Sequence, residues 1–399
     1  MHLGSEIAAG RGNPQEAAAR RESPLEGRSF MFNQPQAYGV GAHQSIVQPS
    51  PSHIIQLWQA YLANVDPMMK VIHAPTVQYI ILGQIGRPSM AANEQALMSA
   101  IYLISAVSMT NGDCGPTLHQ SRGELIHEFR TVTENALSAA GFVTTTDIIV
   151  LQALVLYLAA LRAIGETPYV WSMTGLAIRI AGTIGLARDG IVLGLPPFEC
   201  EMRRRLWWAI VYLDARTAEL VGQDGDLLLR DYDVHLPANL NDTELFPNMQ
   251  RIHGDRPAAT DTIYVQYRAT VATCLRAMPN VTGPVGTWQK MRATDVPVSE
   301  KLEVISAVSK RLDGELLRHC DSTVPLQKLT INSVNTMLTK MRLVGNVPLP
   351  NSPTTSSGEG YQDNIFEYSL KIVQLQLELW TEPSLQKWKW HWQGQFQWV

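Results

Sequence analysis

Two patterns in this 399-residue sequence begin like catalytic motifs but lack a required residue. His127-Glu128 opens H-E-x-x-H, in which two histidines on one helix face bind zinc and the glutamate acts as general base. Position 131 holds Thr131, so the second ligand is missing. The glycines of segment 39–41 begin a G-x-G-x-x-G dinucleotide motif, but Gln44 replaces its last glycine and no predicted strand precedes it. We therefore predict no catalytic residue, no bound cofactor and no enzyme activity.

An acidic stretch could bind a cation; it contains Asp224, Asp226, Asp231 and Asp233. An EF-hand loop that starts at Asp224 needs glycine at position 229 and glutamate at position 235. Those positions hold Leu229 and His235, so a solvated acidic loop is the favoured interpretation. His235, His253 and His319 could each bind a metal, but a single histidine is more often a surface or core residue.

The four cysteines are Cys114, Cys200, Cys274 and Cys320. They lie far apart, whereas the thiolates of a structural zinc site are closely spaced along the chain. We predict four reduced thiols that are mostly buried as small apolar groups. No metal site is predicted.

The basic triplet Arg203-Arg204-Arg205 has two interpretations. It could contact phosphate. Alternatively, it opens an amphipathic helix in which Arg205 pairs with Glu201 at i, i+4 while the other two arginines reach nearby acidic loops. The second interpretation is favoured, because the chain has a net charge of −4 rather than the basic excess of a DNA-binding domain.

The elements that would position these residues are predicted to be helices throughout. Residues 1–51 are rich in Gly, Pro, Gln and Ser and are predicted to be a disordered leader without a signal peptide. Ser52 is predicted to cap the first helix and Asp66-Pro67 to end it. Apolar residues then recur at helical spacing in the ranges 54–65, 93–109, 121–139, 146–163, 169–187, 199–221, 261–278, 299–319, 326–344 and 364–381. No strand alternation is present, so we expect an all-α protein with one large irregular domain of about ten helices over residues 52–399.

Three helices have distinctive patterns. The range 146–163 is apolar nearly all round and should lie centrally, and it is too short for a membrane span of about 20 residues. We therefore expect a soluble intracellular protein. The range 169–187 contains Gly175, Gly182 and Gly185, which we attribute to close helix–helix approach. The range 199–221 has the clearest apolar stripe.

The segments 171–190 and 198–222 resemble the regulatory middle homology region of fungal zinc-cluster transcription factors. That family shows a tryptophan, a G-x-A-x-R-x-A stretch, G-L-x-R-D-G, and then an E-x-R-R-R-x-W-W helix with an aspartate shortly after. The corresponding residues here are Trp171, Gly175, Ala177, Arg179, Ala181, Gly185, Arg188, Asp189, Gly190, Glu201, Arg203, Arg204, Arg205, Trp207, Trp208 and Asp214.

The resemblance extends over residues 52–398, with further similar stretches at 150–160, 231–245, 316–330 and 340–344. Two features depart from the family pattern. The usual N-terminal six-cysteine, two-zinc cluster that reads DNA is missing, and the segment 388–399 stops where relatives run on into further helices. The sequence is therefore expected to hold a regulatory domain without the zinc cluster and shortened at its C-terminal end.

The resemblance implies a nuclear regulator of transcription that controls a gene set such as a secondary-metabolite cluster. Such a chain would act through other transcription factors or the transcription machinery, with DNA contacted only indirectly, no membrane association, and a small-molecule effector as a further candidate partner. Two alternatives stay open. The chain could be a non-regulatory cluster protein, either a small-molecule-binding module or an enzyme, or it could be a non-functional truncated regulator.

The resemblance implies architectural roles for the motif residues. Trp207 and Trp208 are expected to anchor the core, and Arg179 and Asp214 to form ion pairs between helices. The competing interpretation places these residues around an effector pocket, since large all-α domains can hold an apolar cavity between helices.

Overall fold

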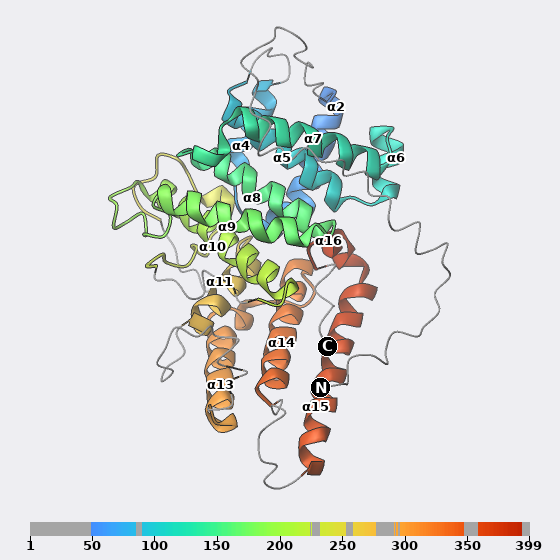
Figure 1. Ribbon diagram of the computed structural model, residues 1–399, viewed down its shortest axis with the longest axis vertical. Helices are drawn as coiled ribbons and strands as arrows, with labels where there is room; N and C mark the ends of the chain where they lie inside the picture. Colours follow the sequence, from blue (N-terminus) through green and yellow to red (C-terminus); the bar gives the residue numbers. More distant parts are fainter. Residues whose placement is uncertain are drawn as a thin grey trace, which may run out of the picture. The chain divides into compact units, whose positions relative to one another are not determined.

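The computed structural model describes residues 49–84, 90–223, 225, 232–252, 258–276, 291, 293, 296–346 and 358–392. All of these belong to the second of two units, residues 42–399. Every element of regular structure in the described ranges is a helix, which confirms the all-α prediction (Figure 1). The predicted leader lies outside the described residues except for its last three. The sequence also predicts a flexible insertion at 345–363, of which residues 347–357 lie outside the described ranges and residues 358–363 belong to a helix.

The first helix, α2 (Pro51–Ala60), is capped by Ser50, whose hydroxyl accepts from the His53 amide at 3.4 Å. The predicted cap, Ser52, is wrong because Pro51 already occupies the first helical position, where no amide hydrogen is needed. The predicted end at Asp66-Pro67 is also wrong. The chain continues through a π-helical turn (Tyr61–Val65) into α3 (Asp66–Met69), whose first turn tolerates Pro67, and Lys70 ends it with a φ of 46°.

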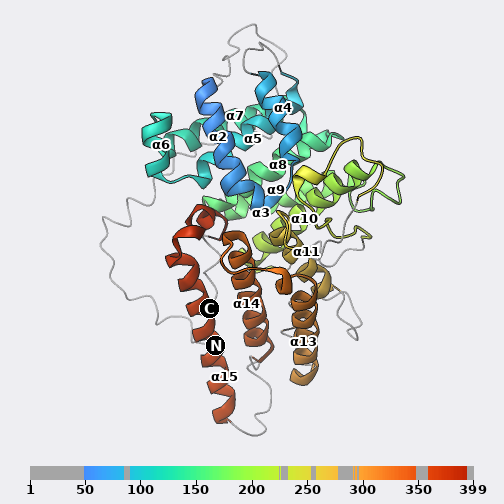
Figure 2. The ribbon, with the colours of Figure 1, turned by 180° about the vertical axis from the view of Figure 1, so that it is seen from behind.

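The centre of the unit is α8 (Ile148–Ala163), which is buried at every position from Val150 to Arg162. It packs with α5 (Ala92–Ser108) and α7 (Arg122–Ala139), as both views of the ribbon show (Figures 1 and 2). The predicted central position of this helix is confirmed. No helix in the described part of the chain is long and apolar enough to span a membrane.

Two short helices were not predicted from the sequence. One is α4 (Ala74–Gln84), and the other is α6 (Asn111–Leu118). The sequence of α6 includes two glycines and a proline, which disfavour a helix. A capping box compensates for this, because the Thr110 hydroxyl accepts from the Asp113 amide and the Asp113 carboxylate accepts from the Thr110 amide.

Helix α9 (Thr167–Thr183) packs against α8 and against α10 (Pro197–Leu220). The prediction that glycines in α9 permit close helix approach is wrong, because a methyl group at Gly175 or Gly182 would meet no atom within 4 Å. Gly185 has a φ of +75° and turns the chain at the end of α9. The glycine in close contact is Gly190, where an added Cβ would lie 2.7 Å from Cys200 Sγ.

The C-terminal helices are α11 (Ile263–Arg276), α13 (Val298–Glu315), α14 (Pro325–Asn346) and α15 (Gly358–Thr381). Helix α14 lies between α13 and α15 in both views and packs on each of them (Figures 1 and 2). The chain then turns through a 3₁₀ segment (Pro383–Trp388) into α16 (Lys389–Trp392), which contacts α5 and α8. The Trp388 and Trp390 indoles each donate, at 3.0 Å, to the Ala63 and Asn64 carbonyls respectively. This anchors the end of the described chain to its beginning.

Candidate functional site

Helix α10 contributes polar side chains to two different places. Its first half joins a buried set of ion pairs that we call the ionic network: Asp66, Lys70, Glu201, Arg205 and Asp242. Its second half lines a cavity that is also bounded by α11, α14, α15 and α16. We describe the two places in turn.

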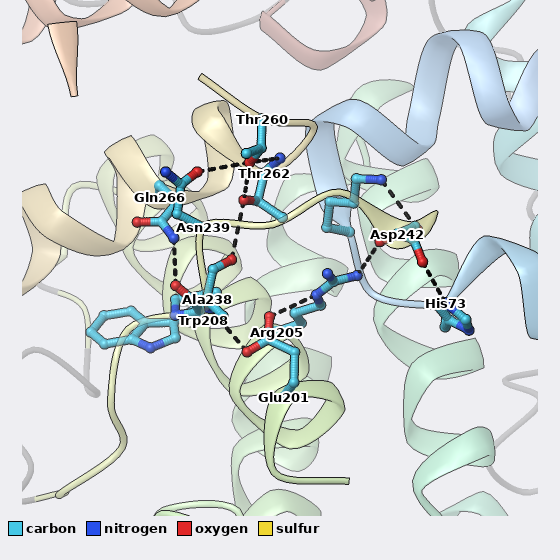
Figure 3. A network of polar contacts seen from close by, with 12 residues as sticks. His73, Glu201, Arg205, Trp208, Ala238, Asn239, Asp242, Thr260, Thr262 and Gln266 are labelled. Carbon is cyan, nitrogen blue, oxygen red and sulfur yellow. Dashed lines mark hydrogen bonds and ion pairs between the residues drawn. The ribbon is translucent and has the colours of Figure 1, made fainter. Parts of the chain in front are cut away.

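Arg205 is the centre of the ionic network, and its side chain is fully buried. Its Nε donates to Glu201 Oε1 at 2.9 Å, one helical turn earlier, and its Nη1 donates to Asp242 Oδ1 at 2.6 Å (Figure 3). The predicted i, i+4 pair with Glu201 is therefore confirmed. Burial raises the pKa of Glu201 despite this pairing, because the whole carboxylate is removed from water.

The network continues to the N-terminal helices through Lys70. Lys70 Nζ lies 2.7 Å from Asp66 Oδ2 and 3.2 Å from Asp242 Oδ2. Burial raises the pKa of Asp242, but Arg205 and Lys70 outweigh it and hold that pKa at about 2. His73 Nε2 also contacts the Asp242 carbonyl at 3.0 Å. Segments more than a hundred residues apart are therefore joined by paired charges.

The same network fixes the loop that follows α10. Glu201 Oε2 accepts from the Ala238 amide at 2.9 Å. Gln266 of α11 donates to the Pro237 carbonyl at 2.5 Å, and Thr262 donates to the Ala238 carbonyl at 3.2 Å (Figure 3). The E-x-R-R-R stretch of α10 and the family-like stretch 231–245 therefore contact each other directly.

Arg204 forms a second buried pair, with Asp189. Its Nε and Nη2 each donate to one carboxylate oxygen of Asp189 at 2.8 Å, and the amides of His235 and Ile191 donate to the same carboxylate. Burial raises the pKa of Asp189, but the hydrogen bonds from Arg204 and the two amides prevail and bring it to about 2. The prediction that Arg204 reaches an acidic loop is confirmed.

Arg203 does not reach an acidic loop as predicted. Its Nη2 donates to the Ile184 carbonyl at 2.8 Å, where α9 ends and carbonyls lack partners. Arg188, in contrast, is exposed and pairs with Asp233 at 3.2 Å. Because Arg204 and Arg205 are buried in ion pairs, the phosphate interpretation of the triplet is wrong.

Both tryptophans of the W-W pair are buried. Trp207 packs edge-on against Tyr232, with ring centroids 5.0 Å apart. Trp208 also contacts Tyr232, and its Nε1 donates to the His235 carbonyl at 2.8 Å. The other face of Trp208 lines the cavity, whereas Trp207 does not.

The remaining motif residues divide between core and surface. Asp214 is buried, close to where a Cβ on Gly225 would lie. Trp171 is half-buried. Arg179 is exposed and forms no ion pair with another residue in the described ranges, so its role as an interhelical ion-pair partner stays a prediction.

Metal binding finds no support in the described ranges. There, no three His, Cys, Asp or Glu side chains come together as a metal site would require. His235 is exposed next to Arg204, and His319 accepts from its neighbour Arg318. All four cysteines are free, two of them buried and two half-buried. His253 and three of the four acidic-loop residues, Asp224, Asp226 and Asp231, lie outside the described residues.

The cavity has a volume of about 160 Å³ and was not predicted in detail from the sequence. Helix α10 contributes Trp208, Tyr212, Arg216 and Glu219, which repeat at steps of four, four and three and so share one face. That face carries two aromatic side chains followed by two charged ones, whereas a core stripe would be purely apolar, and this was the signal in the sequence. Glu219 forms ion pairs with both Arg216 and Lys340.

Comparison with known proteins identifies a family match and several relatives. Residues 58–261 match the family described as fungal specific transcription factor domain. The Aurofusarin cluster transcription factor aurR2 of Gibberella zeae is 32% identical over 350 residues, which is 87% of this chain and 52% of that protein. The Pyriculol/pyriculariol biosynthesis cluster transcription factor 1 of Pyricularia oryzae is 33% identical over 338 residues, 82% of this chain and 45% of that protein. The transcriptional regulator AacuB of Aspergillus aculeatus is 28% identical over 350 residues, 87% of this chain and 47% of that protein. The chain spans about half the length of these relatives.

Proposed function

Because the chain belongs to the fungal specific transcription factor family, we propose that it regulates the transcription of a gene set such as a secondary-metabolite biosynthetic cluster. The observation that carries this proposal is the match of residues 58–261 together with relatives named as cluster transcription factors. The place of action is the nucleus, and the role is regulatory rather than enzymatic.

In this proposal, residues 52–399 form a regulatory domain and not the element that reads DNA. The four cysteines cannot supply a six-cysteine cluster, and the net charge is −4. Arg204 and Arg205 are committed to buried ion pairs. DNA contact would come from residues outside these 399 or from other transcription factors, and this domain would act through protein partners.

The cavity supports a further part of the proposal, control by a small-molecule effector. A cavity between helices with aromatic walls and a few polar groups is the usual form of a small-molecule site. It lies directly against Trp208, a residue of the family motif. An effector bound there would contact α10, α11, α14, α15 and α16 at the same time.

Deletion of the gene followed by transcript profiling tests the regulatory role. We expect coordinated changes in a set of neighbouring genes, and an unchanged transcriptome under conditions in which the gene is expressed would refute the proposal. Mobility-shift assays with the 399-residue chain test the second part. We expect no sequence-selective complex at physiological salt, and a selective complex would show that this domain reads DNA directly.

A further inference from the structure

Positive charge exceeds negative charge around the cavity. Arg216, Lys340 and Arg268 line it, and Glu219 is the single carboxylate among the lining residues that the structure describes. Because Glu219 already forms ion pairs with Arg216 and Lys340, its negative charge does not neutralise Arg268 as well. A partner with negative charge would balance the cavity.

Arg268 is the residue that this imbalance affects most. It is only 8% exposed, and no carboxylate bonds to it among the described residues. Its guanidinium carbon lies 3.9 Å from the centre of the Tyr212 ring, and its Nη1 lies 3.4 Å from His391 Nε2. Stacking on an aromatic ring stabilises a buried cation less than a paired charge does, and a buried ion needs such a charge to offset its desolvation.

A second buried cation increases the positive potential. Arg162, 5% exposed, donates to the His391 carbonyl at 3.0 Å and has no carboxylate partner among the residues that the structure describes. Burial lowers the pKa of Arg162 and holds the pKa of His391 well below its usual range, with Arg268 and Arg162 adding to the effect on His391. His391 is therefore neutral. Burial raises the pKa of Tyr212, but Arg162, Arg216 and Arg268 outweigh it and lower that pKa, so the site favours a negative charge.

Among the described residues that line the cavity, two carry a buried polar atom without a hydrogen-bond partner, and both atoms are donors. They are the Nε of Arg268 and the Nε1 of Trp392, whose side chain is 4% exposed. A buried donor without an acceptor destabilises the fold, because it has lost its hydrogen bonds to water. Two donors therefore point to an acceptor, and the charge balance points to an anionic one.

The walls add a shape requirement. Trp208, Tyr212, Tyr264, Tyr267 and Trp392 line the cavity, so flat rings surround the cationic group. Its volume of about 160 Å³ is close to that of the roughly 150 Å³ apolar cavity that holds benzene in another protein. The space therefore suits one aromatic ring with a small substituent.

We propose that this cavity binds a small aromatic anion, a single ring that carries a carboxylate or phenolate, with Arg268 and Trp392 donating to the anionic group. The inference rests on the proposed function, because this ligand would be the effector of the proposed regulator. The ring stacks between the aromatic walls, and the anionic oxygens accept from the two donors.

Calorimetric titration of the purified chain with benzoate, benzamide and benzamidine tests the charge requirement, because the three probes share one shape and differ in charge. We expect benzoate to bind with a dissociation constant of about 1 mM or tighter. Benzamide should bind at least about tenfold more weakly, and benzamidine should not bind. Equal binding of benzoate and benzamide, or no benzoate binding up to about 10 mM, would overturn the proposal.

Variants test the location. Arg268→Met should weaken benzoate binding at least about tenfold, and Trp392→Phe, which keeps the ring and removes the donor, should weaken it severalfold. Ala272 also lines the cavity. The larger side chain of Ala272→Leu fills the space without removing a polar group, so this variant should block binding. It tests the location even if Arg268→Met fails to fold. Arg179→Met is the matched control, since it removes an exposed arginine elsewhere and should bind as the wild type does.

The outcomes separate the inference from the function. Benzoate binding that Arg268→Met and Ala272→Leu leave unchanged places the ligand elsewhere and refutes the inference. Binding at the cavity together with an unchanged transcriptome after gene deletion supports the inference and refutes the regulatory role. Altered transcripts after gene deletion, together with no benzoate binding, would support the regulatory role and refute the inference.

Discussion

The two halves of α10 use arginine in opposite ways. In the first half, Arg204 and Arg205 each meet carboxylates, and both ends of every pair are buried. In the second half, Arg216 shares one glutamate with Lys340, and the neighbouring Arg268 of α11 has no carboxylate among the described residues. One half satisfies its charges within the fold, and the other leaves a positive charge that a ligand can satisfy.

This difference separates architecture from binding within a single helix. Buried ion pairs fix one geometry, and removing one partner leaves an uncompensated charge. A buried cation without a counter-ion has the opposite property, because its removal relieves a cost. Stability measurements on matched arginine substitutions can therefore distinguish the two roles.

The largest effect is expected for Arg205→Met. It removes the paired charge of buried Glu201 and leaves buried Asp242 paired with Lys70 alone, at a cost of about 3–5 kcal/mol. That is a large part of a total stability of about 5–15 kcal/mol, so the variant should be insoluble or melt far below the wild type. Arg203→Met, which loses only a bond to one carbonyl, is the control and should cost about 1 kcal/mol. Similar melting of both variants would show that the network is not structural.

The tryptophan pair beside the network should follow closely. Trp207 and Trp208 are both buried, and truncating a large buried aromatic costs about 3–5 kcal/mol. We expect sharply lower melting temperatures for both alanine variants. Trp208→Phe keeps most of the packing and loses the bond to the His235 carbonyl, so it should cost about 1 kcal/mol. Two alanine variants that melt as the wild type does would assign these residues to a binding surface.

The Arg204–Asp189 pair, which is separate from the ionic network, makes the stability of the fold depend on pH. Folding lowers the pKa of Asp189 to about 2, from about 3.9 in an unfolded chain. This stabilisation is complete above pH of about 4 and is lost as the pH falls towards about 2. Asp189→Asn should therefore cost about 1.5–3 kcal/mol at neutral pH and show a shallower loss of stability in that window. Parallel acid titrations of the two proteins would contradict this assignment.

The glycines of the motif region differ in a way that one pair of variants can measure. A Cβ on Gly190 would lie 2.7 Å from Cys200 Sγ and 2.9 Å from its Cα, so Gly190→Ala should cost about 1–3 kcal/mol. Gly175→Ala in α9 meets no atom within 4 Å and should stabilise by about 0.5–1 kcal/mol. Chemical denaturation measures both, and a loss of stability in Gly175→Ala would restore the helix-approach interpretation.

The sequence predicted most of the helices, because apolar spacing along 146–163 and 199–221 follows directly from which face is buried. It did not predict α6, since a capping box outweighed unfavourable helix residues. The Arg205–Glu201 pair was predictable because one helix sets its spacing, whereas the contact with Asp242 depends on tertiary structure. The cavity was missed for the same reason, because its walls come from helices that are distant in the sequence.

The smallest stability effect is expected for Arg268→Met, which makes the same replacement as Arg205→Met and so compares the two arginines directly. Arg268→Met loses stacking on Tyr212, worth about 2 kcal/mol at most, but removes a desolvated cation close to Arg162. The opposing terms should leave the free energy of unfolding within about 1 kcal/mol of the wild type. Urea denaturation at neutral pH measures this free energy. The slope of the unfolding free energy against urea concentration should equal that of the wild type. If Arg268→Met destabilises as strongly as Arg205→Met, then both arginines are structural, and the cavity has no need of an anion.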